Sequence, residues 1–206
     1  MMMSTPTDAC YKLLVAGVGG QGVVYLTSLI TEAGVFANVP VASSEIHGIA
    51  QRRGSVVASV TFGEDTFGFI EDGGADLLIG LEPLEAMRCL PFLNQSSCAV
   101  IDDNRLLPHS INIGKRDYPD VTAFIAFLRG NIQQVIFNRE FDPTLLPIMR
   151  NIYILGRAAS LEGFPLSVAA IEATIARRAR PGTSDDIIRA FNMGRTYSEL
   201  EGSRDG

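Results

Sequence analysis

The order of apolar and polar positions in the N-terminal part of the chain predicts a strand, a tight turn and a helix. Leu13–Ala16 is a short apolar run typical of a buried parallel strand, and a glycine-rich stretch follows it. After the glycines, apolar residues recur at steps of three and four, which predicts an amphipathic helix. These residues are Val23, Leu26, Leu29, Ile30 and Ala33.

The middle of the chain alternates further strands with helices. Apolar and β-branched runs predict strands over Ser55–Gly63, Ala75–Glu82, Cys98–Asn104 and Gln133–Asn138. Pro83 predicts the start of a helix that runs to Leu93, because proline is well tolerated in a first helical turn. This alternation indicates an α/β fold, with a Rossmann-like, mostly parallel sheet and flanking helices.

From Pro143 onward the pattern becomes helical, so the fold has a helical C-terminal third. Helices are predicted over 143–160, 165–179 and 184–200, with Ser167 and Ser184 as N-caps. We expect one domain over residues 11–200, with flexible tails at 1–10 and 201–206.

The glycine-rich turn has the chemistry of an anion site. Gly17, Gly19 and Gly22 match the pattern G-x-G-x-x-G, and the intervening Gly20 and Gln21 belong to the same turn. Unpaired N–H groups at a helix N-terminus attract anions, and glycine lets an anion approach the backbone closely. The candidate ligand-binding residues are therefore Gly17, Gly19, Gly20, Gln21 and Gly22.

A dinucleotide site also needs an acidic residue after the second strand, to hold a ribose hydroxyl. That strand is predicted at Val39–Ala42, and Ser43 and Ser44 follow it, with Glu45 arriving late. The ribose-binding acid is thus missing or displaced. A purely structural turn, in which glycine permits tight helix–sheet packing, stays an alternative.

The segment Ala42–Val60 concentrates polar groups where the second strand is expected to end. Glu45, His47 and Arg52 are candidates for the edge of an active site, and Arg53 is a candidate for gripping a phosphate or carboxylate. The alternative for this segment is an ordinary solvated connection.

Composition narrows the functional classes. The net charge of −6, with 17 Lys and Arg in 206 residues, argues against nucleic acid as a partner. The apolar runs are too short to span a membrane, and the first residues do not resemble a signal peptide, so we expect a cytoplasmic protein. With Cys10, Cys89, Cys98 and two histidines, we expect neither a metal site nor an iron–sulfur cluster within this chain.

Common catalytic motifs are absent from the sequence: it has no G-x-S-x-G, GxxxxGK[ST] or H-E-x-x-H. Glu82 and Glu85 flank Pro83 and are expected to complement a helix dipole rather than to act as paired catalytic carboxylates. Asp102 and Asp103, at a strand end, are expected to form a turn.

Four stretches together resemble one protein family. "GVGGQGVV", "SEIHGIAQRRGSVVASVTFG", "GLEPLEAMRCLPFL" and "RNIYILGRAAS…RAFNMG" occur in the order typical of the gamma-type domain of 2-oxoacid:ferredoxin oxidoreductases. Within that family they resemble the beta subunits of indolepyruvate:ferredoxin oxidoreductases. Two residues depart from the pattern: Arg53 stands where glycine is usual, and Tyr25 where a small residue is usual.

The resemblance implies a heteromeric enzyme that decarboxylates an arylpyruvate, forms an acyl-CoA and passes electrons to ferredoxin. It implies that thiamine diphosphate, Mg and the iron–sulfur clusters lie on a large partner subunit, that CoA is a co-substrate, and that this chain alone binds no cofactor and is inactive. A homodimer is considered for the isolated chain.

Two alternatives remain at this point. The chain could be an assembly or regulatory subunit of a pyruvate, 2-oxoglutarate or branched-chain 2-oxoacid oxidoreductase. It could also be a free-standing nucleotide-binding protein, a reading that depends on the glycines alone.

Overall fold

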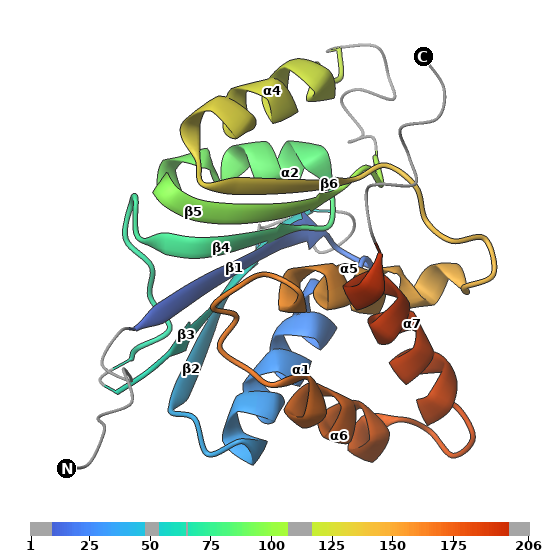
Figure 1. Ribbon diagram of the computed structural model, residues 1–206. Coiled ribbons are helices and arrows are strands. Elements are labelled where there is room, and N and C mark those ends of the chain that lie inside the picture. The colour runs from blue at the N-terminus through green and yellow to red at the C-terminus, as the bar shows by residue number, and fades with distance from the viewer. Residues whose placement is uncertain (1–9, 48–53, 65, 107–116, 198–206) are drawn as a thin grey trace.

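The computed structural model describes residues 10–47, 54–64, 66–106 and 117–197, and within them a single six-stranded sheet forms the centre of the molecule (Figure 1). The strand order is β2-β3-β1-β4-β5-β6, and β1, β4, β5 and β6 form a parallel block. The expected Rossmann-like, mostly parallel sheet is confirmed. The strands are β1 (Tyr11–Val18), β2 (Val41–His47), β3 (Ser55–Phe62), β4 (Ala75–Gly80), β5 (Leu93–Asp102) and β6 (Gln134–Asn138).

The β2–β3 region differs from the sequence expectation. Residues Ser43–His47, expected to leave the second strand, belong to β2 itself and pair antiparallel with Val56–Val60 of β3. β3 also pairs antiparallel with β1 and so separates β2 from β1. The physical reason is the connection over 48–54, which is too short for the crossover that two parallel neighbours require.

Helices cover the sheet unequally on its two faces (Figure 1). One face packs against α1 (Val23–Phe36) and the C-terminal helices, and the opposite face packs against α2 (Pro83–Arg88) and α4 (Val121–Asn131). All five apolar residues predicted to face inward from α1 are buried. Helix α4 was not predicted, although Asp120 caps it by accepting a hydrogen bond from the Ala123 N–H at 3.1 Å.

The end of α2 and the start of β5 differ from the boundaries predicted from the sequence. The helix expected from Pro83 to Leu93 ends at Arg88, and a short 3-10 turn at Leu90–Phe92 leads directly into β5. Pro91 removes a backbone donor at that turn, which is incompatible with a continuing helix. As a result β5 begins at Leu93, earlier than the predicted Cys98.

The helical C-terminal third is confirmed, with α5 (Arg150–Ala159), α6 (Val168–Arg178) and α7 (Ser184–Thr196), after a 3-10 turn at Pro147–Met149. Helices α5 and α7 touch backbone to backbone: a Cβ on Gly194 would lie 2.0 Å from the Tyr153 carbonyl oxygen. Ser167 caps α6 as expected, through the Ala170 N–H. Ser184 does not cap α7, because it is the first helical residue and its hydroxyl faces Asp185.

Candidate functional site

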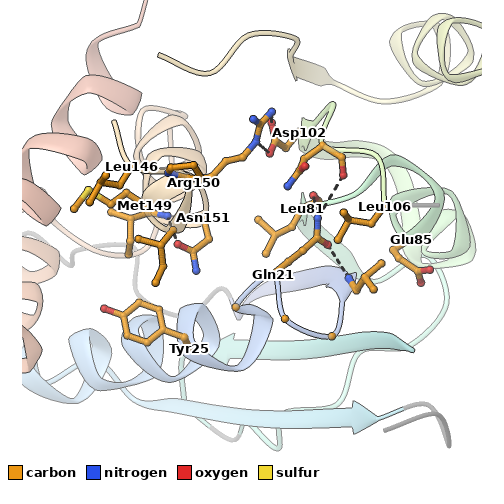
Figure 2. A pocket seen from close by; sticks show the side chains of 18 of the residues that line it. Gln21, Tyr25, Leu81, Glu85, Asp102, Leu106, Leu146, Met149, Arg150 and Asn151 are labelled. Atoms are coloured by element: carbon orange, nitrogen blue, oxygen red, sulfur yellow. Dashed lines mark hydrogen bonds and ion pairs between the residues drawn. The ribbon is translucent and has the colours of Figure 1, made fainter. Parts of the chain in front are cut away.

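A large pocket opens at the edge of the sheet where the parallel strands end. Its volume is about 1280 Å³, and its lining comes from the glycine turn, the chain after β4 and β5, the start of α5 and the connection between α6 and α7. Ligands of open α/β sheets bind at this carboxyl edge. Figure 2 shows apolar side chains on both sides of the pocket, with Tyr25, Leu146 and Met149 opposite Leu81 and Leu106.

The glycine turn between β1 and α1 forms one wall of the pocket. Gly20 and Gly22 have positive φ angles of 101° and 85°, and Gly22 is the N-cap of α1. A Cβ on Gly22 would lie 2.3 Å from the Asn151 side-chain nitrogen of α5. The Gly19 N–H donates to the Gly54 carbonyl at 2.9 Å, which joins the turn to the start of β3. The turn is therefore constrained by its own backbone and by two other elements.

Gln21 shapes this turn from within the chain. Its Oε1 accepts from the Val18 N–H at 2.7 Å, and its Nε2 donates to the Leu81 carbonyl at 2.8 Å and to the Asn104 carbonyl at 3.4 Å. Its own backbone N–H donates to the Val18 carbonyl. Gln21 thus connects the ends of β1, β4 and β5, and Figure 2 shows its amide between them.

Asp102 is the buried acid of the pocket, at the end of β5 and 1% exposed. Arg150 of α5 donates to both carboxylate oxygens, with Nη2 2.8 Å from Oδ1 (Figure 2). The Asn138 side chain also donates to Oδ1, at 2.9 Å. Burial raises the pKa of Asp102, and hydrogen bonds from Arg150 and Asn138 oppose that rise. The expectation of a turn residue is wrong for Asp102, because its partners lie far along the chain and leave no local sequence pattern.

Arginines surround the pocket, although the chain carries a net charge of −6. They are Arg88, Arg105, Arg150, Arg178 and Arg180. Most have a partner: Arg105 pairs with Asp103 at 2.6 Å, Arg178 lies 3.3 Å from Glu32 and 5.0 Å from the ring centre of Tyr25, and Arg88 lies 3.7 Å from Glu85. Within the described residues the Arg180 guanidinium has no ion pair. The pocket lining therefore contains more basic than acidic side chains.

Glu82 and Glu85 lie at the start of α2, as expected. The Glu82 carboxylate accepts the Glu85 N–H at 2.9 Å and the Tyr118 hydroxyl, so it caps the helix. Glu85 lines the pocket and is 3% exposed, and its Oε2 has no hydrogen-bond partner among the described residues. A buried oxygen without a donor is costly, and the nearest cation, Arg88, lies 3.7 Å from the other carboxylate oxygen, Oε1.

The polar segment singled out in the sequence reaches the pocket only in part. Glu45 is exposed on β2 and lines a separate shallow groove of about 430 Å³ beside α1. His47 ends β2 opposite Val56, while its side chain, Arg52 and Arg53 lie outside the described residues. Gly54 and Ser55, which follow this segment, do line the pocket.

The described residues do not fit an iron–sulfur cluster or another metal centre. Cys10 is exposed, Cys89 is buried and Cys98 is half-buried, and each belongs to a different part of the fold. In the described part of the chain, no three His, Cys, Asp or Glu side chains gather in a way that could hold a metal ion. Across the same residues, none of the helices has the length and apolar character needed to cross a membrane.

The sequence profile described as pyruvate ferredoxin/flavodoxin oxidoreductase matches residues 12–197. The chain belongs to this family. The resemblance drawn from the four sequence stretches is thereby confirmed.

Among relatives within the pyruvate ferredoxin/flavodoxin oxidoreductase family, the indolepyruvate oxidoreductase subunit IorB of Methanothermobacter thermautotrophicus is 32% identical. The alignment covers 89% of this chain and 95% of that protein. The gamma subunit of a keto/oxoacid ferredoxin oxidoreductase from Geobacter sulfurreducens has the same fold, with a TM-score of 0.62 at 20% identity over 90% of this chain and 96% of that one.

A larger enzyme contains the same fold as one part of a longer polypeptide. The 2-oxoglutarate:ferredoxin oxidoreductase of Magnetococcus marinus, solved with 2-oxoglutarate, coenzyme A and succinyl-CoA, matches with a TM-score of 0.61 at 16% identity. The match covers 90% of this chain but only 30% of that one.

Proposed function

We propose that this chain is the cofactor-free subunit of an indolepyruvate:ferredoxin oxidoreductase, and that its pocket receives the phosphate end of coenzyme A. The observation that carries the proposal is the arginine-lined pocket at the glycine turn of a chain in this family. The name of the 32% identical relative supports indolepyruvate as the 2-oxoacid.

In this proposal the large subunit carries the cofactors and this chain binds the acyl acceptor. Thiamine diphosphate with Mg and the iron–sulfur clusters would lie on a large partner subunit, where they supply carbanion stabilisation and a path for two electrons to ferredoxin. This chain would hold the acyl acceptor instead. It belongs to a family of oxidoreductase subunits, and its described residues do not fit a metal centre.

The pocket has the features that coenzyme A requires. Its volume of about 1280 Å³ exceeds that of ordinary ligand pockets, which suits a long ligand. The Arg180 and Arg178 side chains offer positive charge to phosphates, and the turn from Val18 to Gly22 offers close backbone approach. The apolar side chains of Tyr25, Leu146 and Met149 would contact the uncharged part of the molecule.

Four further residues remain part of the proposal on sequence grounds. Glu45, His47 and Arg52 are proposed to face the partner's thiamine site, and Arg53 to contact an anion near the glycine turn. A free-standing nucleotide-binding protein is less well supported, because β3 occupies the position beside β1 from which a dinucleotide fold holds the ribose.

The test is Arg180→Ala in the complex reconstituted with the large subunit. We expect the KM for CoA to rise about tenfold with kcat unchanged, because an arginine–phosphate hydrogen bond contributes about 1.5–3 kcal/mol. Arg129→Ala is the matched control, since Arg129 is an exposed arginine on α4, away from the pocket lining.

Three outcomes separate the alternatives. A raised KM for CoA in an intact complex supports the proposal. Loss of assembly with Arg180→Ala would instead support a scaffold role for this surface. An unchanged KM for CoA in an active, assembled complex would contradict the CoA pocket.

A further inference from the structure

Among the described elements, helices pack extensively on only one face of the half of the sheet formed by β2 and β3. Among the described elements, α1 is the helix that packs extensively on these strands, where it contacts Ala58, Val60 and Phe62. Side chains alternate along a strand, so Ser59 and Thr61 belong to the opposite face. Helices α2 and α4 lie on that face but pack mainly against β1, β4, β5 and β6 (Figure 1).

Residues 66–70, in the connection from β3 to β4, lie on this second face and are anchored there by the backbone of Gly68. The Gly68 N–H donates to Thr61 Oγ1 at 3.1 Å, and the Ser59 hydroxyl donates to the Gly68 carbonyl. Gly68 approaches β2 so closely that a Cβ would lie 2.9 Å from the carbonyl carbon of Ser43. The position of this segment on the sheet is therefore fixed by specific contacts.

The anchored segment presents two aromatic rings to solvent. Phe67 is 84% exposed and Phe69 is 74% exposed, one on each side of the buried Gly68. An exposed pair of phenylalanines on a fixed backbone offers a large apolar contact area at little cost in conformational entropy. We call Phe67 and Phe69 the aromatic pair.

The connection that carries the aromatic pair is acidic. Glu64 and Asp72 are exposed in the same connection, and Glu71 nearby is neutralised by Lys12, whose Nζ lies 2.6 Å from its carboxylate. No lysine or arginine occurs between Phe62 and Arg88 in the sequence. The charge here is opposite to that of the arginine-lined pocket.

We propose that the aromatic pair is a docking surface for the cofactor-bearing large subunit, which presents an apolar recess bordered by lysine or arginine. The inference rests on the proposed function, in which this chain works within a heteromeric enzyme. The charge of this connection favours the large subunit over a second copy of this chain as the binding partner. A two-fold contact between copies would place Glu64 and Asp72 against the same acidic patch, whereas a basic surface complements them.

The test compares Phe67→Ser/Phe69→Ser with wild type in binding to the large subunit, measured by calorimetry. We expect the dissociation constant to rise about 30-fold or more, as for aromatic anchors at the centre of an interface. Phe127→Ser on α4 is the matched control, because Phe127 is 54% exposed and lies outside this connection, and it should bind like wild type. Glu64→Lys/Asp72→Lys should weaken binding about tenfold at low salt, and less at high salt.

Each result has a distinct meaning. Equal binding by wild type and the double serine variant would overturn the docking surface and leave the proposed function standing. A wild-type chain that does not bind the large subunit at all would overturn the proposed function. A dimer of the isolated chain that is lost in the double serine variant would assign the aromatic pair to a second copy and overturn the partner proposed above.

Discussion

The pocket edge and the second face of β2 and β3 both depend on a glycine that lets two elements lie close together, but the two surfaces differ in shape and charge. In both regions a glycine lets backbone approach a neighbouring element closely, Gly22 against Asn151 and Gly68 against Ser43. The pocket is concave and lined by several arginines, among them Arg150, which pairs with the buried Asp102, and Arg178, which lies over the Tyr25 ring. The second face of β2 and β3 carries the exposed rings of Phe67 and Phe69, and Glu64 and Asp72 of the same connection have no ion pair among the described residues.

Because of this difference, substitutions in the pocket should mainly lower the stability of the chain, whereas substitutions of the aromatic pair should mainly weaken binding to the large subunit. Pocket residues such as Asp102 and Arg150 also hold β5 to α5, so changing them should damage the fold before it reports on a ligand. Phe67 and Phe69 bury little surface within the chain, so changing them should affect association alone. The three predictions below test this separation, beginning with the largest expected loss of stability.

Gly22→Val should destabilise the isolated chain by about 4 kcal/mol. Valine is strained at a φ of 85°, and its Cβ would also overlap the side chain of the buried Asn151. Each of these two effects costs about 1–3 kcal/mol. Urea denaturation gives the measurement. Gly20→Ala is the control: no atom lies within 4 Å of its Cβ position, so only the backbone cost of about 1 kcal/mol remains. A stable Gly22→Val chain that had lost only CoA affinity would contradict the structural role.

Arg150→Ala should cost about 3 kcal/mol at neutral pH, because it leaves the buried Asp102 charge without its main partner. The pKa of Asp102 is already raised by burial, and loss of Arg150 raises it further. A carboxyl whose folded pKa is raised above its unfolded value loses stability as the pH rises through the folded pKa. The stability lost in Arg150→Ala should therefore become smaller as the pH falls toward 3.8, the ordinary pKa of an aspartate.

The double variant Asp102→Asn/Arg150→Ala checks this cause. It removes the buried charge together with its partner, so it should be more stable than Arg150→Ala at neutral pH. It should also lose the pH dependence between neutral pH and about pH 5. Thermal denaturation across this range gives both results. A pH-independent loss in Arg150→Ala itself would show that packing, not charge, holds α5 to β5.

The elements that could be predicted are those whose constraints lie close together in the sequence. The apolar period identified α1, because Leu26, Leu29 and Ile30 all face one core. The glycine turn was identified because glycine is needed at nearby positions for local reasons: Gly22 has a positive φ, and a Cβ on Gly17 would lie 2.9 Å from the Val23 side chain. The antiparallel β2–β3 pair was missed, although the short connection over 48–54 excludes a crossover.

The parts of the site that could not be predicted depend on partners far apart in the chain. Asp102 and Arg150 are separated by 48 positions, and neither has a distinctive neighbour. The sequence around Phe67 does not distinguish it from a buried phenylalanine. Its exposure depends on which part of the sheet the later helices cover. Its buried anchor, Gly68, is held by Thr61 and Ser59 through contacts that only the folded sheet creates.

The smallest expected effect on stability concerns that anchor. Thr61→Val keeps the shape of a side chain that is 1% exposed but removes the oxygen that accepts the Gly68 N–H, so stability should fall by about 1–2 kcal/mol. Because both rings remain while their backbone loses a fixed position, binding to the large subunit should weaken severalfold. Thr27→Val is the control, since its buried hydroxyl donates only within α1, to the Val23 carbonyl. If Thr61→Val lost stability but bound the large subunit as tightly as wild type, docking would depend on the rings alone and not on the segment that presents them.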